Sequence, residues 1–266
     1  MYPFLLVAFA TIGLLFGPTN ASGDSSLPHV SAPAGSIVGR SSNGLETFAG
    51  IPYAHPPIGQ LRLRPPVRLS KTLKSYNASG PAPWCPQMPA SQYGLDIINA
   101  TIGIENLGLP DVVGQEDCLT LTVIRPSGVD CTDRLPVLFW IYGGGFQQGG
   151  TEQFDGSLLT AQAKEMGQPF IWVAVNYRIN GFGFLAGHQL ADEGSVNLGM
   201  LDQRMGMQWV ADNIASFGGD PDKVTIWGES AGALSVAVHL GMYQGNNTYK
   251  GTDGVEETME QTGFPA

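Results

Sequence analysis

The residue with the clearest chemical potential is Ser230, which lies in the run GESAG at residues 228–232. A short apolar segment, residues 224–227, precedes this run, and a stretch rich in Ala, Val and Leu follows it, so we expect the serine between a strand and a helix. Flanking glycines are needed where a serine must occupy a sharp turn with its hydroxyl raised at a helix N-terminus. Because GxSxG alone arises by chance in a glycine-rich chain, the strand, turn and helix order carries the prediction of a nucleophilic serine.

Three glycines, Gly143, Gly144 and Gly145, directly follow another apolar run at residues 137–142. A tetrahedral intermediate needs backbone N–H donors aimed at its oxyanion, and residues without Cβ can bring their amides close to a ligand. We therefore expect these glycines to form one side of an oxyanion hole and Ala231 to donate the other amide. A phosphate-binding loop is the alternative for a glycine run, but the Lys and Ser/Thr of a P-loop are absent.

Strands and helices that alternate along the second half of the chain must position these residues. Continuous apolar runs at residues 137–142, 170–175 and 224–227 are typical of buried parallel strands, and helix-like segments separate them. Earlier segments at residues 36–38, 46–49 and 119–124 have the short apolar or alternating character of antiparallel edge strands.

A long helix is expected before residues 224–227, ended by Gly218 and Gly219. Its apolar residues recur at near-helical spacing, and polar residues fill its other faces: Leu201, Met205, Trp209, Ile214 and Phe217 against Asp202, Gln203, Asp212 and Asn213. The order of elements predicts an α/β fold.

The composition fits one globular domain. With 43% hydrophobic and 14% charged residues, the 266-residue chain can bury a core. A net charge of -10 repels phosphate backbones, so we expect no nucleic-acid partner, and a neutral or interfacial substrate fits better.

The N-terminus indicates export. The apolar run at residues 4–17 is too short to span a bilayer comfortably, so we expect a signal peptide over residues 1–21 rather than a membrane anchor, and a secreted, extracellular domain over residues 22–266. In that compartment Asn77, Asn99 and Asn246 become candidate glycosylation sites. Three cysteines favour one disulfide and a leftover thiol, and no Cys or His spacing suggests a metal site.

Several motifs together resemble the type-B carboxylesterase/lipase family, which includes cholinesterases and secreted fungal lipases. Residues 217–221 (FGGDP), 224–227 (VTIW) and the GESAG run resemble the serine signature of that family. Residues 116–121 (EDCLTL) resemble its second signature, although Thr122 stands where the family usually has Asn or Asp. Further matches occur at 51–54, 142–146, 176–178, 197–199 and 202–204, so the resemblance covers roughly residues 33 to 245.

The resemblance implies an α/β-hydrolase fold, with a mixed, mostly parallel sheet and flanking helices, truncated at its C-terminal side. It implies that Gly144, Gly145 and Ala231 are the oxyanion donors, and that no cofactor is needed. It also pairs Cys85 with Cys118, which leaves Cys131 as the odd thiol. Such a bridge would contribute about 3–4 kcal/mol in the chain-entropy model.

The segment between the paired cysteines, residues 86–117, is expected to be a loop with many apolar residues. In lipases such a loop acts as a lid that exposes apolar area at an oil interface, while a static Ω-type loop packed on the core is the alternative.

A serine hydroxyl needs a histidine to take its proton and a carboxylate to orient that histidine. His29, His55 and His188 precede the serine, and His239 lies nine positions after Ser230, about 13 Å along a helix axis. Each is expected to be a surface or packing residue, because the fold places the acid and then the histidine later in the chain.

Two further carboxylate features bear on the missing acid. Glu229 is not expected to serve, because its place in the turn points it away from a histidine on the other side of the serine. The tail at residues 255–260 (VEETME) puts three carboxylates where the family has an apolar strand, which a buried parallel strand would not tolerate. Divergence, a splice variant or a mistaken gene model could each explain this ending, and the last is favoured.

We therefore expect a carboxylic ester hydrolase, esterase or lipase, that acts on a small-molecule or lipid ester through an acyl-Ser230 intermediate, with its acid and histidine in sequence outside this chain. Transient contact with a lipid interface is also expected. The alternative is a catalytically silent fragment or a secreted binding module of the same fold.

Overall fold

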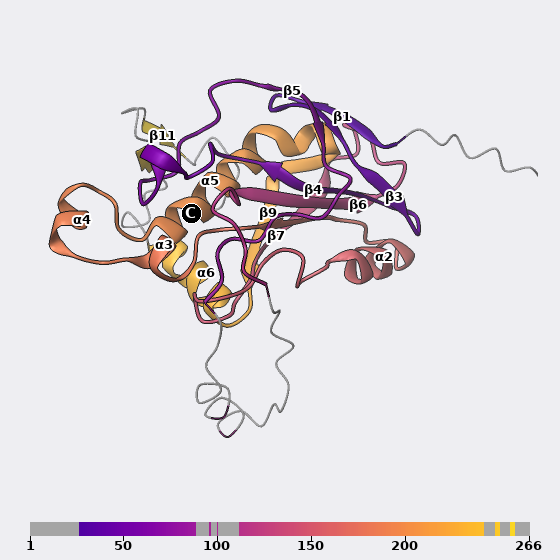
Figure 1. Cartoon of the computed structure of the whole chain (residues 1–266). Coiled ribbons are helices and arrows are strands. Elements are labelled where there is room, and N and C mark those ends of the chain that lie inside the picture. Colours follow the sequence, from indigo (N-terminus) through magenta and orange to yellow (C-terminus); the bar gives the residue numbers. More distant parts are fainter. Residues whose placement is uncertain are drawn as a thin grey trace, which may run out of the picture.

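The computed structural model describes residues 27–88, 96, 100, 112–241, 248–250 and 256–258. A mixed sheet of six strands lies at its centre, in the order β3-β4-β6-β8-β7-β9 (Figure 1). The bounds of these strands are β3 Arg40–Ser42, β4 Leu45–Pro52, β6 Thr120–Pro126, β7 Leu135–Ile141, β8 Ile171–Val175 and β9 Gly219–Gly228.

The direction of pairing changes across this sheet. From β3 to β8 the neighbours are antiparallel, and β7 pairs in parallel with both β8 and β9. The register places Trp140 opposite both Ala174 and Trp227. Parallel pairing brings the C-terminal ends of β7 and β9 to one edge, which places the residues that follow them side by side.

Helices cover both faces of the parallel half. On one face, Gly206 of α5 (Leu198–Asn213) lies so close to β8 that an added Cβ would be 2.6 Å from Val175 Cγ2. On the other face, Trp140 and Trp172 stack with ring centroids 5.6 Å apart, and α2 (Ser157–Glu165) begins after Gly156, which is packed against Trp172. Neighbouring residues of a strand point to opposite faces, so a layer forms on each side of the sheet.

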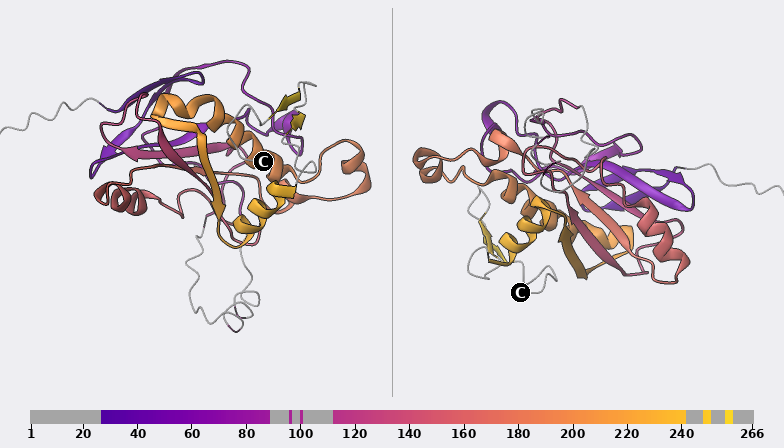
Figure 2. Two further views of the ribbon diagram at one scale, coloured as in Figure 1. Left: turned by 180° about the vertical axis from the view of Figure 1, so that it is seen from behind. Right: turned by 90° about the horizontal axis from the view of Figure 1, so that it is seen from below.

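The remaining described elements lie at the periphery. Strands β1 (His29–Ala32), β2 (Gly35–Val38) and β5 (Leu73–Asn77) form a small sheet, and β10 (Thr248–Lys250) pairs with β11 (Glu256–Thr258) in another. Two short helices, α3 (Asn180–Phe184) and α4 (His188–Asp192), precede α5. Helix α4 projects from the body of the molecule (Figures 1 and 2). Two 3-10 turns complete the set, Gly59–Leu61 and Ile214–Phe217.

The expectation of edge strands near the start of the chain is wrong for residues 119–124. Strand β6 lies inside the sheet, between β4 and β8, and every one of its residues is buried. The alternation of Thr with apolar residues resembles a strand with one wet face, but Thr120 and Thr122 are only 4% and 6% exposed. Strand β4 is likewise interior, and β2 is the middle strand of its small sheet, with β5 parallel to it.

The long helix and the strand after it also differ from expectation at their ends. Helix α5 stops at Asn213, and a 3-10 turn continues to Phe217 before Gly218 ends it with φ 86°. Strand β9 then begins at Gly219 rather than at Val224, with a register shift in its pairing with β7. Pro221 is tolerated there because, among the described strands, β9 pairs only with β7 and leaves its other edge open.

Candidate active site

Ser230 occupies a strained turn between β9 and α6 (Ala231–Gly241). Its φ is 52°, in the left-handed region that residues other than glycine rarely adopt, and its side chain is on the exposed surface. Strain of this kind persists only where the surroundings hold the backbone in place. The turn therefore raises the Ser230 hydroxyl at the N-terminus of α6.

The two flanking glycines hold this turn against the end of β7. A Cβ added at Gly232 would lie 2.0 Å from the carbonyl oxygen of Ile141, and one added at Gly228 would lie 2.6 Å from the same oxygen. Real Cβ atoms do not approach so closely, so neither position accepts a side chain without movement of the backbone. The Gly232 amide also donates to the Glu229 carbonyl oxygen over 2.8 Å, which closes the turn.

The glycine run after β7 lies directly beside the serine. A Cβ at Gly143 would be 2.9 Å from Ser230 Cβ and 2.5 Å from Glu229 Oε2. Gly144 and Gly145 have φ values of 95° and 63°, and the Gly144 carbonyl accepts hydrogen bonds from the Gln147 and Gln148 amides. That turn needs glycine at position 144, because a Cβ there would lie 2.1 Å from the Gln148 carbonyl oxygen.

Ala231 directly follows Ser230 in the chain. It is 3% exposed and is the first residue of α6, where the helix leaves amide groups without partners of its own. The helix N-terminus also carries partial positive charge, which favours an anion at this point.

The orientation of Glu229 is clear in the structure. Its carboxylate lies over Gly143, on the side of the glycine run, and its side chain is exposed. The nearby Tyr177 hydroxyl has a pKa well above its usual range, chiefly because it is buried and further because of its electrostatic interactions with Tyr142 and Glu229. Tyr177 therefore stays neutral.

A pair of tyrosines braces the strand ends beneath the glycine run. Tyr142 and Tyr177 follow β7 and β8, stack with ring centroids 4.5 Å apart, and are fully buried. Each hydroxyl donates to the main-chain carbonyl oxygen of the other residue, over 3.0 and 2.8 Å. These reciprocal bonds fix the ends of two neighbouring strands, and no periodicity in the sequence indicates them.

A buried ion pair ties the same strand end to α5. Arg178 Nε and Nη2 donate to the two carboxylate oxygens of Asp202 over 2.8 and 2.7 Å, and the Arg178 amide donates to Asp202 as well. Both side chains are almost wholly inaccessible, at 3% and 0%. Arg178 and Asp202 belong to the motifs at residues 176–178 and 202–204, so these motifs hold the loop after β8 against α5. The sequence alone did not indicate this role.

The structure places none of the chain's four histidines beside Ser230. His29 bonds to Ser36 and His55 to Ser70, both at the surface, and His188 is exposed at the start of α4. His239 is 5% exposed, and its Nε2 donates to Gln203 Oε1 over 2.7 Å. Burial and the nearby Arg204 lower the pKa of His239 to about 3, so it is a neutral packing residue.

The cysteines and the remaining expected sites fall in different parts of the molecule. Cys85 and Cys118 form a disulfide with Cα atoms 5.0 Å apart, and Cys131 is free and exposed. Asn77 ends β5 in an exposed position, and its Oδ1 accepts hydrogen bonds from both the amide and the hydroxyl of Ser79. The signal peptide expected at 1–21, most of the expected lid at 86–117, and Asn99 and Asn246 lie outside the described residues.

The described part of the chain lacks two features. It contains no helix long and apolar enough to cross a membrane. It also contains no group of three or more His, Cys, Asp or Glu side chains arranged to hold a metal ion.

Comparisons with known proteins show the family of the chain. The family model described as "Carboxylesterase family" matches residues 26–251. A secreted triacylglycerol lipase of Gibberella zeae is 55% identical over 226 residues, 84% of this chain and 38% of the lipase. An acetylcholinesterase of Caenorhabditis briggsae is 39% identical over 77% of this chain and 31% of its own length.

A solved structure of Aspergillus niger EstA superposes on this chain with a TM-score of 0.68. The two are 30% identical, and the match covers 86% of this chain and 39% of that one. The chain thus spans between about a third and two fifths of the length of these relatives. The expected α/β-hydrolase fold is confirmed by these likenesses, and the chain belongs to the carboxylesterase family.

Proposed function

We propose that the protein is a carboxylic ester hydrolase in which Ser230 attacks the ester carbonyl carbon and forms an acyl-enzyme. The observation that carries this proposal is the position of Ser230, at φ 52° on a turn wedged against the end of β7 by Gly228 and Gly232. A strained residue that its surroundings enforce is typical of functional sites. Membership of the carboxylesterase family supports the same reaction.

The oxyanion hole in this proposal consists of the amides of Gly144, Gly145 and Ala231. When Ser230 Oγ bonds to the carbonyl carbon, the carbonyl oxygen gains negative charge and requires N–H donors at about 3 Å. The glycine run lies against Ser230 through Gly143, and the start of α6 adds the Ala231 amide and a favourable helix dipole. Loss of one such donor typically costs about 3 kcal/mol of transition-state stabilisation.

The proton acceptor for Ser230 is proposed to lie outside these 266 residues. His239 is the histidine nearest to Ser230 in sequence, and it is buried against Gln203. Burial and Arg204 lower its pKa to about 3, so it cannot take up the serine proton near neutral pH. The other three histidines lie in β1, after β4 and in α4. A histidine and an orienting carboxylate must therefore come from elsewhere.

A lipid ester is the proposed substrate class, reached by transient contact with a lipid interface. A relative 55% identical in sequence is named as a secreted triacylglycerol lipase, and a second, from Botryotinia fuckeliana, is named as a secreted lipase at 49% identity. Their names also support export of this protein, with residues 1–21 as signal peptide and with glycosylation at Asn77, which the structure exposes. Residues 86–117 are proposed as the lid.

Hydrolysis of short-chain p-nitrophenyl esters tests the assignment of the missing base. The 266-residue chain should hydrolyse them no faster than its Ser230→Ala variant, because Ser230 lacks a proton acceptor in this chain. Clear serine-dependent turnover by the chain alone would overturn the placement of the histidine outside it.

A further inference from the structure

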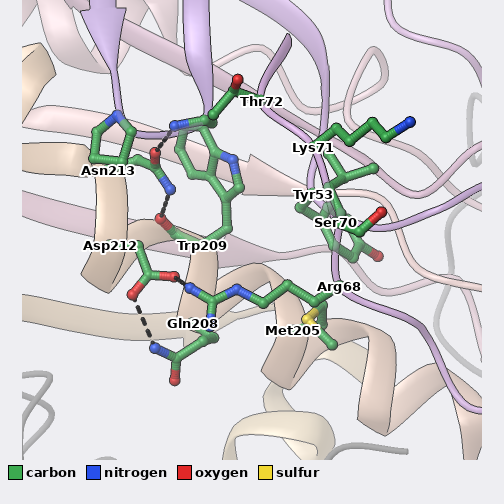
Figure 3. A pocket seen from close by; sticks show the side chains of 13 residues that line it. Tyr53, Arg68, Ser70, Lys71, Thr72, Met205, Gln208, Trp209, Asp212 and Asn213 are labelled. Atoms are coloured by element: carbon green, nitrogen blue, oxygen red, sulfur yellow. Dashed lines mark hydrogen bonds and ion pairs between the residues drawn. The ribbon is translucent and has the colours of Figure 1, made fainter. Parts of the chain in front are cut away.

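Contacts between distant segments surround a cavity of about 190 Å³ near Trp209 (Figure 3). Arg68, which follows β4, forms an ion pair with Asp212 of α5, and Asp212 also accepts a hydrogen bond from Gln208 Nε2 over 3.1 Å. These contacts tie α5 to the N-terminal part of the chain. A second set of contacts between distant segments, made by residues 85–88, involves the loop that carries the glycine run.

The glycine loop, residues 143–150, comes shortly after β7 and contains two of the proposed oxyanion donors. Its centre is a closed turn, in which the amides of Gln147 and Gln148 donate to the Gly144 carbonyl oxygen over 3.0 and 3.2 Å. The Gln148 carbonyl oxygen also lies 2.1 Å from the place that a Cβ of Gly144 would occupy. Because these atoms are in contact, a shift of Gln148, or of Gly149 next to it, would move Gly144 as well.

Gln87, two residues after Cys85, bonds the end of this loop at Gly149. Its Oε1 accepts a hydrogen bond from the Gly149 amide over 2.7 Å, and its Nε2 donates to the Gly149 carbonyl oxygen over 3.0 Å. Nε2 also donates to the Cys85 carbonyl oxygen over 2.7 Å. A carboxamide both donates and accepts, so it bonds the two polar groups of one residue as a neighbouring strand would. Both N–H groups of the Gln87 side chain are used, which fixes its orientation.

The residues on either side of Gln87 bond the same loop. The Met88 amide donates to the Gln147 carbonyl oxygen over 2.9 Å. The Pro86 carbonyl oxygen accepts from Asn180 Nδ2 over 2.7 Å, and the Asn180 amide donates to the Phe146 carbonyl oxygen over 2.6 Å. Phe146 has a φ of 59°, a backbone strain that persists only where the surroundings enforce it.

The segment that carries Gln87 is itself fixed at its base. Cys85 forms the disulfide with Cys118, which is wholly buried shortly before β6. The Gln87 main-chain amide donates to the Val113 carbonyl oxygen over 3.0 Å, and a Cβ added at Gly114 would be 2.1 Å from the Cys85 carbonyl oxygen. A side chain that extends from such a base can hold a loop rather than follow its movement.

We propose that Gln87 is a positioning residue for the proposed ester hydrolysis. By holding Gly149, its side-chain amide keeps the turn on Gly144 closed, and so keeps the Gly144 and Gly145 amides aimed at the oxyanion beside Ser230. This role rests on the proposed function, because that function gives the two amides a charge to bind. Donors of an oxyanion hole act at about 3 Å from the oxygen, so small shifts of the glycine loop weaken them.

Hydrogen exchange of single amides in the 266-residue chain, followed by NMR, tests this role. Gln87→Met has a side chain of similar length without the carboxamide, and its Gly149 amide should exchange about three- to tenfold faster than that of the parent. The amides of Gln147 and Gln148 should speed up by about the same factor, because the turn on Gly144 loosens. The Gly144 signal should shift or broaden.

Gln115→Met is the matched control. Gln115 belongs to the same disulfide-closed segment, and its Nε2 donates to the Asp117 carbonyl oxygen over 2.8 Å, so this hydrogen bond stays outside the glycine loop. The control should leave the exchange of the Gln147, Gln148 and Gly149 amides within about twofold of the parent.

Gln87→Glu is a second variant, which does not rely on the tolerance of methionine at this position. Its carboxylate can still accept from the Gly149 amide, but it presents a second oxygen, in place of a donor, to the carbonyl oxygens of Gly149 and Cys85. It should speed up exchange in the glycine loop at least as much as Gln87→Met does. Urea unfolding of each variant shows whether it is folded.

Three results in folded variants would overturn the proposal. The first is unchanged exchange throughout the glycine loop. The second is acceleration confined to Gly149, which would make Gln87 a local contact that does not control the turn on Gly144. The third is an equal acceleration of the amides in β7 and β8, which would reduce the effect to a loss of global stability. The measurement needs no turnover, so its outcome is separate from that of any test of ester hydrolysis.

Discussion

At the scale of single residues, the serine turn is held by the absence of side chains at its neighbours. Gly232 is the tightest of these positions, because its α-carbon faces the Ile141 carbonyl oxygen with no room for a Cβ. The glycine pattern around Ser230 predicts a sharp turn, and the structure adds the atoms that the glycines avoid. Those atoms belong to β7, about 90 residues earlier in the chain, so no local rule of sequence could name them.

Gly232→Ala should therefore destabilise the protein by about 1–3 kcal/mol, the usual range for an overpacked site. Urea unfolding measures the difference in free energy. Gly241→Ala is the matched control, because it lies in the same helix, α6, and a Cβ there meets no atom within 4 Å. If the two variants were equally stable, the contact between the serine turn and β7 would not restrain the fold.

His239 couples the stability of the chain to pH. Its pKa is about 3 in the folded protein against 6.5 for the free side chain, so the unfolded state binds the proton more readily between these values. The stability that His239 contributes is thus fully present above pH 6.5 and falls as the pH drops from 6.5 toward 3, with about 3 kcal/mol lost by pH 4.5.

His239→Gln should flatten this acid dependence, since glutamine can keep the bond to Gln203 without titrating. The measurement is urea unfolding at a series of pH values from 7 to 4.5, compared with the parent chain. His188→Gln, at an exposed position, serves as the control and should leave the slope as it is. An unchanged slope in His239→Gln would mean that His239 is protonated in the folded state.

At the scale of elements, apolar patterning predicts the helices and buried strands in the second half of the chain. It does not predict which elements lie beside each of them. Strand β6 has the alternation of an edge strand, yet β4 and β8 flank it and bury its threonines. Helix α5 shows the same limit, because Asp202 and Gln203 occupy positions that periodicity assigns to polar faces and are nonetheless wholly buried. Their partners, Arg178 and His239, come from other elements that the local sequence does not identify.

The link between α5 and the loop after β8 predicts a large effect for Asp202→Asn. This change leaves the Arg178 guanidinium buried without its counter-charge, which costs about 3–5 kcal/mol at comparable sites. Glu193→Gln breaks a pair with Arg64 in which the side chains are 52% and 48% exposed, and should cost at most about 1 kcal/mol. Thermal and urea unfolding of the two variants compare them directly, and equal losses would contradict the role given to Asp202.

At the scale of the whole molecule, the sequence predicts the family and a glycine run that acts together with Ser230 and Ala231. The parallel pairing of β7 with both β8 and β9 brings the glycine run beside Ser230, and the apolar runs of the sequence predict these strands as buried and parallel. The Tyr142–Tyr177 brace and the cavity near Trp209 arise from contacts between distant segments, so they appear only in three dimensions. The whole arrangement contains a proposed nucleophile and proposed oxyanion donors, and none of the four histidines, all of which are described, lies beside the serine.

The most direct test of Ser230 as a nucleophile supplies the missing part from a relative. Residues 27–241 of this chain are joined to the C-terminal remainder of the Gibberella zeae lipase, and hydrolysis of p-nitrophenyl butyrate is compared with that of the Ser230→Ala form of the same chimera, both shown to be folded by circular dichroism. The account predicts turnover that falls at least about 10⁴-fold in the Ser230→Ala form. Equal turnover by the two folded chimeras would contradict it.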